Sequence, residues 1–280
     1  MGSIVYADGE WQSGDVKLTG PMDHAFWKAS AVFDGGRSIS RLAPDLDLHC
    51  ARAVSSAAAI RLKPPLSSSQ VFDICREAIS RFPPEAELYL RPMFYAAQGS
   101  VLPDPESTQF ALAVYDAPLP QNGFTVCLST RRRPARDMAP TNAKATCLYP
   151  NSYLAIMEAR DRGFDNAIVL DCNGNVAEFA NANLWIAKGG VAVTPAINGT
   201  FLNGITRQRL ITLLRSDGIE VQERALSFDE VLHADEVFNS GNFSKLLPVT
   251  RVEGRELQSG PIYRRARQLY FDYAQGAQVL

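Results

Sequence analysis

One lysine of the chain lies in a stretch with no other charge. Lys144, in the segment TNAKATCLYPNS, is the only charged residue between Asp137 and Glu158. Two interpretations are open. Lys144 is a surface lysine at the end of a strand, or it is a buried amine whose pKa falls in apolar surroundings, so that it acts as a nucleophile. A nucleophilic amine of this kind forms a Schiff base with a carbonyl compound.

If the carbonyl compound is pyridoxal 5'-phosphate (PLP), the site also needs an acid for the pyridine nitrogen, a donor for the ring oxygen O3′ and a cradle for the phosphate. Glu178 is the only acid between Asp171 and Asp217. A carboxylate in such apolar and amide-rich surroundings needs a cation, and a protonated pyridine is one. An ordinary surface carboxylate at a turn is the alternative.

Two later segments have the composition of anion sites. NGIT, residues 203–206, lies at a helix start, where free backbone N–H groups and the positive end of the helix favour a phosphate. Simple N-capping by Thr206 is the alternative. FNSGNFS, residues 238–244, ends a strand in a Ser-Gly-Asn turn, which is a second anion nest or an ordinary turn.

Each pattern is weak by itself, but the ordered set is specific for a fold and a cofactor. The set comprises MDHAFWKASAVFDGGR, LDLHCAR, LYLRP, AKATCLYPNSYLA, GNVAEFANANLW, FLNGITRQRL and ADEVFNSGNFSKLLPV. With these segments the chain resembles the fold-type IV PLP-dependent aminotransferases, and among them the branched-chain amino acid aminotransferases. The resemblance implies PLP as cofactor and a homodimer whose active sites are built from both subunits.

The resemblance also implies roles for individual residues. Lys144 is implied as the Schiff-base lysine, which shuttles a proton between the substrate Cα and C4′ of the cofactor. Tyr149 is implied as the donor to O3′, and Glu178 as the carboxylate under the pyridine nitrogen. The other implied cofactor contacts are Arg52 at the phosphate, Leu202 on one ring face, Ile205 and Thr206 in the phosphate cradle, and Asn242 in the second phosphate loop.

On the substrate side the match is partial. Tyr89 and Arg91 resemble the Y-x-R strand that shapes carboxylate recognition in the branched-chain enzymes, although a cross-strand pair on a solvated face would have the same sequence. Phe33 and Arg37 fall in VFDGGR, where the family lines its pocket. Phe33 equally fits a position in the core.

Three departures leave the substrate side chain open. Lys28 replaces the usual pocket tyrosine, and Phe243 replaces a small residue after the second phosphate loop. The stretch YAAQGSVLPDPES lacks the glycine-rich pattern of the family. Phe243 would narrow one pocket, whereas Lys28 would attract a second carboxylate or extend to solvent.

Three hypotheses about function follow. The first is an aminotransferase that moves the amino group of a branched-chain or related hydrophobic L-amino acid to a 2-oxo acid such as 2-oxoglutarate. The second keeps fold and cofactor but acts on D-amino acids or (R)-amines, or is an aminodeoxychorismate lyase. The third is a non-catalytic relative that binds PLP or an anionic metabolite.

Hydrophobic periodicity and turn residues predict an α+β fold in two unequal lobes. Strands are expected at 4–7, 10–12, 32–36, 37–42, 87–97, 109–117, 124–130, 166–171, 176–180, 184–188, 191–195, 219–226 and 235–240. Helices are expected at 46–60, 70–82, 151–163, 206–217, 227–234 and 261–276. The Pro- and Gly-containing stretch 117–123 is the expected linker between a small domain, 1–116, and a large PLP-binding domain, 124–280.

Composition narrows the class of protein further. The net charge of −2 gives no indication of binding to nucleic acid or to an anionic membrane. The basic run RRRPAR at 131–136 is expected to be a solvated loop or the rim of an anion site. Five scattered cysteines and the absence of a signal-peptide pattern favour a cytoplasmic protein with reduced thiols. The three histidines lack metal-ligand spacing, so no metal is expected.

Overall fold

The computed structural model describes residues 2–277, which divide into two compact units. Unit 1 comprises the chain up to Leu119, the segment Asn142–Leu148 and the residues from Ala274 on. Unit 2 comprises Pro120–Thr141 and Tyr149–Tyr273. Strands and helices alternate irregularly in both units, as the α+β prediction requires.

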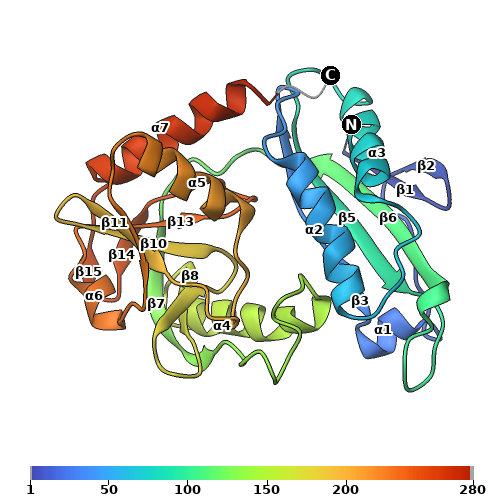
Figure 1. Ribbon diagram of the computed structural model, residues 1–280, viewed down its shortest axis with the longest axis horizontal. Coiled ribbons are helices and arrows are strands. Elements are labelled where there is room, and N and C mark those ends of the chain that lie inside the picture. The colour runs from blue at the N-terminus through green and yellow to red at the C-terminus, as the bar shows by residue number, and fades with distance from the viewer. Residues whose placement is uncertain (1, 278–280) are drawn as a thin grey trace. The chain divides into compact units, whose positions relative to one another are not determined.

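Unit 1 is built on an antiparallel sheet in the order β2-β1-β6-β5-β3, with β4 also pairing β5 (Figure 1). Its strands are β1 (Ser3–Ala7), β2 (Glu10–Ser13), β3 (Ala31–Phe33), β4 (Gly36–Ile39), β5 (Glu87–Ala96) and β6 (Thr108–Asp116). Its helices are α1 (His24–Lys28), α2 (Leu46–Ala59) and α3 (Ser68–Ser80), with short 3-10 turns η1 (Pro105–Ser107) and η2 (Thr146–Leu148).

The two faces of this sheet have different partners. Leu88, Leu90 and Phe94 of β5 point to one face, where they form a core with α2 and α3. Since side chains alternate along a strand, Tyr89 and Arg91 lie on the opposite face. The sheet thereby packs its main core against the helices, whereas its other face combines Tyr89 and Arg91 with a smaller apolar cluster around Val5 and Tyr95.

Unit 2 contains two sheets. The first has the order β15-β14-β7-β8-β9, and the second β12-β11-β10-β13. The strands are β7 (Phe124–Arg132), β8 (Asn166–Leu170), β9 (Val176–Phe179), β10 (Asn183–Lys188), β11 (Val191–Pro195), β12 (Val221–Arg224), β13 (Glu236–Ser240), β14 (Val249–Val252) and β15 (Arg255–Glu256). The helices are α4 (Tyr149–Asp161), α5 (Ile205–Ser216), α6 (Phe228–Leu232) and α7 (Pro261–Gln275), which ends in unit 1.

The sheets of unit 2 pack face to face. Ile168 and Phe179 of the first sheet share a buried core with Ile186 and Val237 of the second. Helix α4 packs on the outer face of the first sheet, and α5 and α7 pack on the outer face of the second. The resulting layers within unit 2 can be followed in Figure 1.

Local sequence signals explain most element boundaries. Asp8 and Gly9 both adopt positive φ, 53° and 83°, in the turn of the β1–β2 hairpin. Ser67 and Ser227 begin α3 and α6 through capping boxes with residues three positions on. Gly163, with φ 79°, follows the end of α4. The strands expected at 4–7 and 10–12 and the helices expected at 70–82, 151–163 and 227–234 are present, with ends that differ by a few residues.

Other expectations differ from the structure. Helix α1 and strands β14 and β15 carry too few apolar positions to be found by periodicity. Strands β3 and β4 were expected around Gly35 and Gly36, and both exist, but each pairs with β5. Among the described residues no helix is long and apolar enough to cross a membrane.

The division of the chain also departs from the expected one in two segments. The chain first passes from unit 1 to unit 2 after Leu119, which lies within the expected linker. Residues 142–148 and those from 274 on, however, belong to unit 1, the smaller one. Backbone pairing holds both segments there, since Val32 bridges to Ala145 and the N–H of Ala43 donates to the carbonyl of Ala277 at 2.9 Å. Such pairings across long sequence separations leave no local signal.

Helix α7 begins on a buried carboxylate. Glu236 is 4% exposed, and its two oxygens accept hydrogen bonds from the backbone N–H groups of Ile262 at 2.9 Å and Tyr263 at 2.7 Å. The carboxylate therefore satisfies amides that a helix start leaves unpaired, and its charge opposes the positive end of the helix dipole. A Cβ on Gly260 would lie 2.1 Å from the Glu236 carboxyl carbon, so glycine permits this approach.

We predict that Glu236→Gln lowers the free energy of unfolding by about 1–2 kcal/mol, because the substituted amide offers one acceptor where two are needed and removes the charge. The measurement is the midpoint of urea denaturation. Glu256→Gln, at an exposed glutamate of β15, removes the same charge and is the matched control. Equal midpoints for the two variants would contradict the capping role.

Candidate functional site

Unit 1 holds Lys144 in a fixed backbone position. The carbonyl of Lys144 accepts a hydrogen bond from the N–H of Phe33 at 3.1 Å, and its own N–H donates to Oγ of Ser56 at 3.1 Å. Its neighbours Ala143 and Ala145 are fully buried, and Lys144 itself is half-buried. The side chain therefore extends from a segment that is packed on both sides. Its Nζ lies 5.0 Å from the centre of the Phe33 ring.

The polar face of the unit 1 sheet lies beside this lysine. In the sheet, Tyr89 of β5 is directly opposite Arg37 of β4 and Tyr115 of β6, with Arg91 two residues along the same face. Arg91 donates to Oη of Tyr115 at 2.6 Å. Burial raises the pKa of Tyr89, and the charge of Lys144 partly offsets this effect. Phe33, Tyr89, Arg91 and Lys144 thus form one neighbourhood.

Tyr89 approaches the backbone of Gly35 closely. A Cβ on Gly35 would lie 2.1 Å from the tyrosine oxygen, so this glycine leaves room for the hydroxyl group. Arg37 is 1% exposed, its guanidinium donates to the carbonyl of Ala117, and burial lowers its pKa. Lys28, by contrast, is exposed on α1, with its amine 4.8 Å from the ring of Trp27.

Arg52 is held by a buried carboxylate that the sequence did not single out. Asp34 is fully buried and accepts from Nε of Arg52 at 2.6 Å, from its Nη2 at 2.9 Å and from Nδ1 of His49 at 2.7 Å. Burial by itself raises the pKa of Asp34, but the nearby Arg52 and His49 outweigh it and hold that pKa well below its usual range. Arg52 remains partly accessible, with 18% of its side chain exposed.

In unit 2, Glu178 is buried beside a cation. Oε1 of Glu178 lies 3.3 Å from Nε of Arg133, whose side chain is 7% exposed. Arg133 belongs to the run RRRPAR, which was expected to be a solvated loop or the rim of an anion site. The burial of Arg133 contradicts the solvated loop at this residue. Its guanidinium also donates to the carbonyl of Thr200 at 3.2 Å, so the strand end carries it inward. The contact between Glu178 and Arg133 thus lies in the interior, where water screens it little.

Asn183 connects several of the predicted cofactor contacts. Its Nδ2 donates to the carbonyl of Leu202 at 3.0 Å and lies 3.4 Å from Oε2 of Glu178. A Cβ on Gly204 would be 2.0 Å from Oδ1 of Asn183, so the start of α5 contacts this side chain directly. Strand β10 also pairs with β13, and this pairing places Asn183 opposite Ser240, the last residue of β13. The two expected phosphate segments therefore lie at one end of β10.

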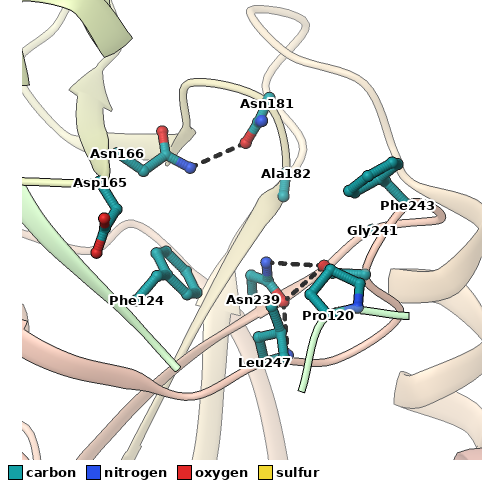
Figure 2. Close-up of a pocket in the computed structure, with 11 residues that line it drawn as sticks. Pro120, Phe124, Asp165, Asn166, Asn181, Ala182, Asn239, Gly241, Phe243 and Leu247 are labelled. Atoms are coloured by element: carbon teal, nitrogen blue, oxygen red, sulfur yellow. Dashed lines mark hydrogen bonds between the residues drawn. The ribbon is translucent and has the colours of Figure 1, made fainter. Parts of the chain in front are cut away.

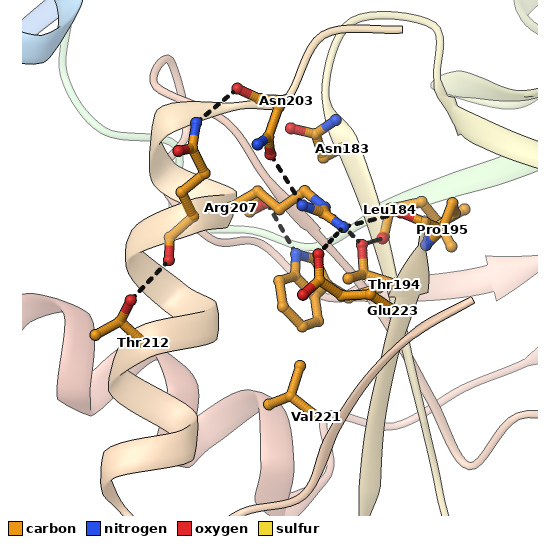
Figure 3. A network of polar contacts seen from close by, with 12 residues as sticks. Asn183, Leu184, Thr194, Pro195, Asn203, Arg207, Thr212, Val221 and Glu223 are labelled. Carbon is orange, nitrogen blue, oxygen red and sulfur yellow. Dashed lines mark hydrogen bonds and ion pairs between the residues drawn. The ribbon is translucent and has the colours of Figure 1, made fainter. Parts of the chain in front are cut away.

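The start of α5 has the form of an anion site. Gly204 is the N-cap residue, so no side chain occupies the first-turn amides from that position. Thr206 lies inside the helix and is 2% exposed, so N-capping by Thr206 is excluded. A buried arginine, Arg207, ties this first turn to β11 and β12 through Thr194 and Glu223 (Figure 3).

The second loop follows β13. Asn242 is half-buried, and Phe243 is 53% exposed. Phe243 lines a small pocket together with Gly241 and Asn181, as Figure 2 shows. Across this pocket, Asn166 donates to Asn181 at 2.9 Å.

Tyr149 is the first residue of α4 and belongs to unit 2, whereas Lys144 belongs to unit 1. The predicted residues therefore form two groups, each described within its own unit. Unit 1 contains Lys28, Phe33, Arg37, Arg52, Tyr89, Arg91 and Lys144. Unit 2 contains Tyr149, Glu178, Leu202, Ile205, Thr206, Asn242 and Phe243.

Comparisons with known proteins extend over nearly the whole chain. Residues 31–252 match the family model described as amino-transferase class IV. The branched-chain-amino-acid aminotransferase of Escherichia coli K12 is 32% identical over 277 residues, which cover 93% of this chain and 88% of that protein.

Two solved structures are similar throughout. An aminotransferase from Brucella abortus, in a crystal structure bound to the cofactor PLP, has a TM-score of 0.96 and 43% identity, covering 98% of this chain and 100% of that chain. The branched-chain aminotransferase of the archaeon Thermoproteus uzoniensis, in a structure with norvaline, has a TM-score of 0.90 and 29% identity, covering 98% of this chain and 96% of that chain.

We predict that Asp34→Asn lowers the free energy of unfolding by about 3 kcal/mol at neutral pH, because it leaves Arg52 and His49 without their shared charge. The folded-state pKa of Asp34 is below the ordinary value of 3.8. The stabilisation that the Asp34 carboxylate provides is therefore complete above pH 3.8, and it is lost as the pH falls from 3.8 toward the folded-state pKa. Urea denaturation from pH 8 to pH 2 measures the difference between wild type and variant.

The control is Asp73→Asn, at an exposed aspartate of α3. Its difference from the wild type should be within about 0.5 kcal/mol at every pH. An Asp34→Asn difference that grows as the pH falls below 3.8 would have the wrong sign for a carboxylate with a depressed pKa.

Proposed function

Because the chain belongs to the class IV aminotransferase family, we propose that it is a PLP-dependent aminotransferase that moves the amino group of a branched-chain or related hydrophobic L-amino acid to a 2-oxo acid such as 2-oxoglutarate. The fold-type IV architecture with its α+β organisation is confirmed by the solved structures. The observation that carries the proposal is that each unit keeps groups of the expected kinds. Unit 1 has a half-buried lysine, and unit 2 has a buried carboxylate and a helix start with a glycine N-cap.

The residues present fit PLP chemically. Glu178 is a carboxylate whose charged form is favoured by Arg133, so it is suited to accept a hydrogen bond from a protonated pyridine nitrogen. The start of α5 offers the backbone N–H groups of its first turn to a dianionic phosphate. In unit 1, Arg52 is fixed by Asp34 and partly exposed, and the family resemblance implies that its guanidinium binds the phosphate.

When bound, PLP supplies an electron sink that stabilises negative charge at the substrate Cα. The chain supplies the proton chemistry and the orientation. Lys144 moves the proton at the substrate Cα, and its anchored backbone keeps the amine in reach through successive half-reactions. Glu178 keeps the pyridine nitrogen protonated, and Tyr149 donates to the ring oxygen O3′.

Substrate recognition is assigned to the polar face of the unit 1 sheet. Arg91 and Tyr115 form a donor pair, and Tyr89 presents a hydroxyl group against Gly35. Guanidinium and phenol groups arranged in this way recognise a carboxylate. Phe33 adds an apolar surface near Lys144, which suits a hydrophobic side chain. Arg37 is buried opposite Tyr89 in the sheet, and a hydrogen bond from its guanidinium to the carbonyl of Ala117 fixes its position.

The alternative of the same fold is a D-amino acid or (R)-amine transaminase, or an aminodeoxychorismate lyase. The exposed Phe243 and Lys28 favour it, because both depart from the branched-chain pattern at positions expected to contact the substrate. Against it stand Tyr89, Arg91 and Tyr149, which match the branched-chain group.

We further propose a homodimer in the cytoplasm. The dimer rests on the family resemblance, in which both subunits build the active site. The cytoplasm is supported by the five cysteines, all of which are free thiols and three of which are buried.

Lys144→Ala is predicted to abolish transamination and the absorbance band of the enzyme near the visible edge, because the amine that anchors the cofactor and carries the proton is gone. The comparison is with Lys188→Ala, at an exposed lysine at the end of β10, which should keep both band and activity. A purified wild type that stays colourless with added PLP would refute every enzyme hypothesis for this chain.

A donor panel separates the two substrate assignments. With L-valine, L-leucine, D-alanine and (R)-1-phenylethylamine, we expect half-reaction spectra to show fast conversion by the L-amino acids and little by the other two. Arg91→Met should lower kcat/KM for L-leucine at least about tenfold, since it removes a charge-assisted contact. Strong turnover of the (R)-amine with none of L-leucine would decide for the alternative.

A further inference from the structure

The second loop of unit 2 contains a buried lysine that has no assigned role. Lys245 closes the loop after β13: its carbonyl accepts a hydrogen bond from the N–H of Gly241 at 2.9 Å, and its own φ is 57°. The residue is 1% exposed although lysine is among the amino acids least often buried. A left-handed backbone at a non-glycine residue and a buried ammonium are both unfavourable, so specific contacts must compensate for them.

The contacts of Lys245 are with the loop and with helix α7. Its Nζ donates a hydrogen bond to Oδ1 of Asn242, and it lies 5.5 Å from the centre of the Tyr270 ring. An ammonium group has only donors, so the carboxamide of Asn242 must turn its oxygen toward Lys245. The Nδ2 group of Asn242, which is a donor, is thereby directed away from Lys245.

The position of this loop indicates a role for the contact between Lys245 and Asn242. Ser240, immediately before Gly241, pairs with Asn183, and the side chain of Asn183 contacts Gly204 at the start of α5. The loop and the helix start are therefore neighbours within unit 2. A cation buried behind one of them increases the attraction of the pair for an anion, because little water screens it.

We propose that Lys245 is a positioning residue for the phosphate group of PLP. It fixes the carboxamide of Asn242 so that the amide donor faces the phosphate, and it places a positive charge behind the second loop. The inference rests on the proposed function for the identity of the anion. It adds a specific dependence on the phosphate, which a lysine buried only for packing would not produce.

The experiment compares two ligands that differ only in the phosphate. Apoprotein is titrated with PLP and with pyridoxal, and the absorbance change gives both dissociation constants. For Lys245→Met, which preserves the length and apolar character of the side chain, we expect PLP to bind about tenfold more weakly or worse and pyridoxal to bind within about twofold of wild type. Lys188→Met removes an exposed lysine of the same unit and should leave both constants unchanged.

A double-mutant cycle tests the route through Asn242. If Lys245 acts mainly by orienting this carboxamide, Lys245→Met should have less effect on PLP affinity in an Asn242→Ala background than in wild type. Lys245→Gln, which keeps a donor but lacks the charge, is the second variant. It should lose at least about threefold in PLP affinity, again with pyridoxal unchanged.

The outcomes distinguish this inference from the proposed function. Equal losses for PLP and pyridoxal in Lys245→Met, or no loss for either, would overturn the role of Lys245 while leaving the enzyme assignment in place. A wild type that binds neither ligand would overturn both.

Discussion

The carboxamide of Asn183 is the interaction on which the candidate cofactor site of unit 2 depends. Its amide donates to the carbonyl of Leu202, and its oxygen lies against Gly204. Because the same residue pairs with Ser240 in the sheet, one side chain fixes the start of α5 relative to the loop that follows β13. Without this contact, the start of α5 and the loop after β13 would share no residue that positions both. Preorganised donors are what an anion site needs, since donors that must first be brought together bind less tightly.

Each unit contains a buried carboxylate that is paired with a basic side chain. Asp34 is buried between Arg52 and His49, and Glu178 is buried beside Arg133. A lone carboxylate in either place would take up a proton, because burial favours the neutral form. The paired cation keeps the charge and also fixes the direction of the side chain. In unit 1 the carboxylate orients an arginine that is predicted to contact the cofactor, whereas in unit 2 the arginine accompanies a carboxylate that is itself a predicted cofactor contact.

Much of the architecture could be predicted from local sequence signals. Strand alternation, capping boxes and Asp-Gly or Asn-Gly turns mark elements through interactions of neighbouring residues, and these elements are present. Helix α1 and strands β14 and β15 are short, and their burial patterns give no clear period. The membership of residues 142–148 in unit 1 depends on pairing with Val32 and Phe33, more than a hundred positions away. No local pattern contains that information.

The limit of prediction from local sequence patterns is clearer for the candidate site than for the fold. The family resemblance supplied the residues expected to touch the cofactor, whereas Asp34, Arg133, Asn183 and Lys245 are the residues that hold them. Arg133 illustrates the cause, since a run of arginines is ordinarily solvated and only one of its members follows the strand into the interior. A supporting residue is defined by what it contacts, and its contacts here span between 3 and 67 positions of sequence. Residue types with functional chemistry can therefore be recognised in order along a chain, while the partners that orient them become visible only when the chain is folded.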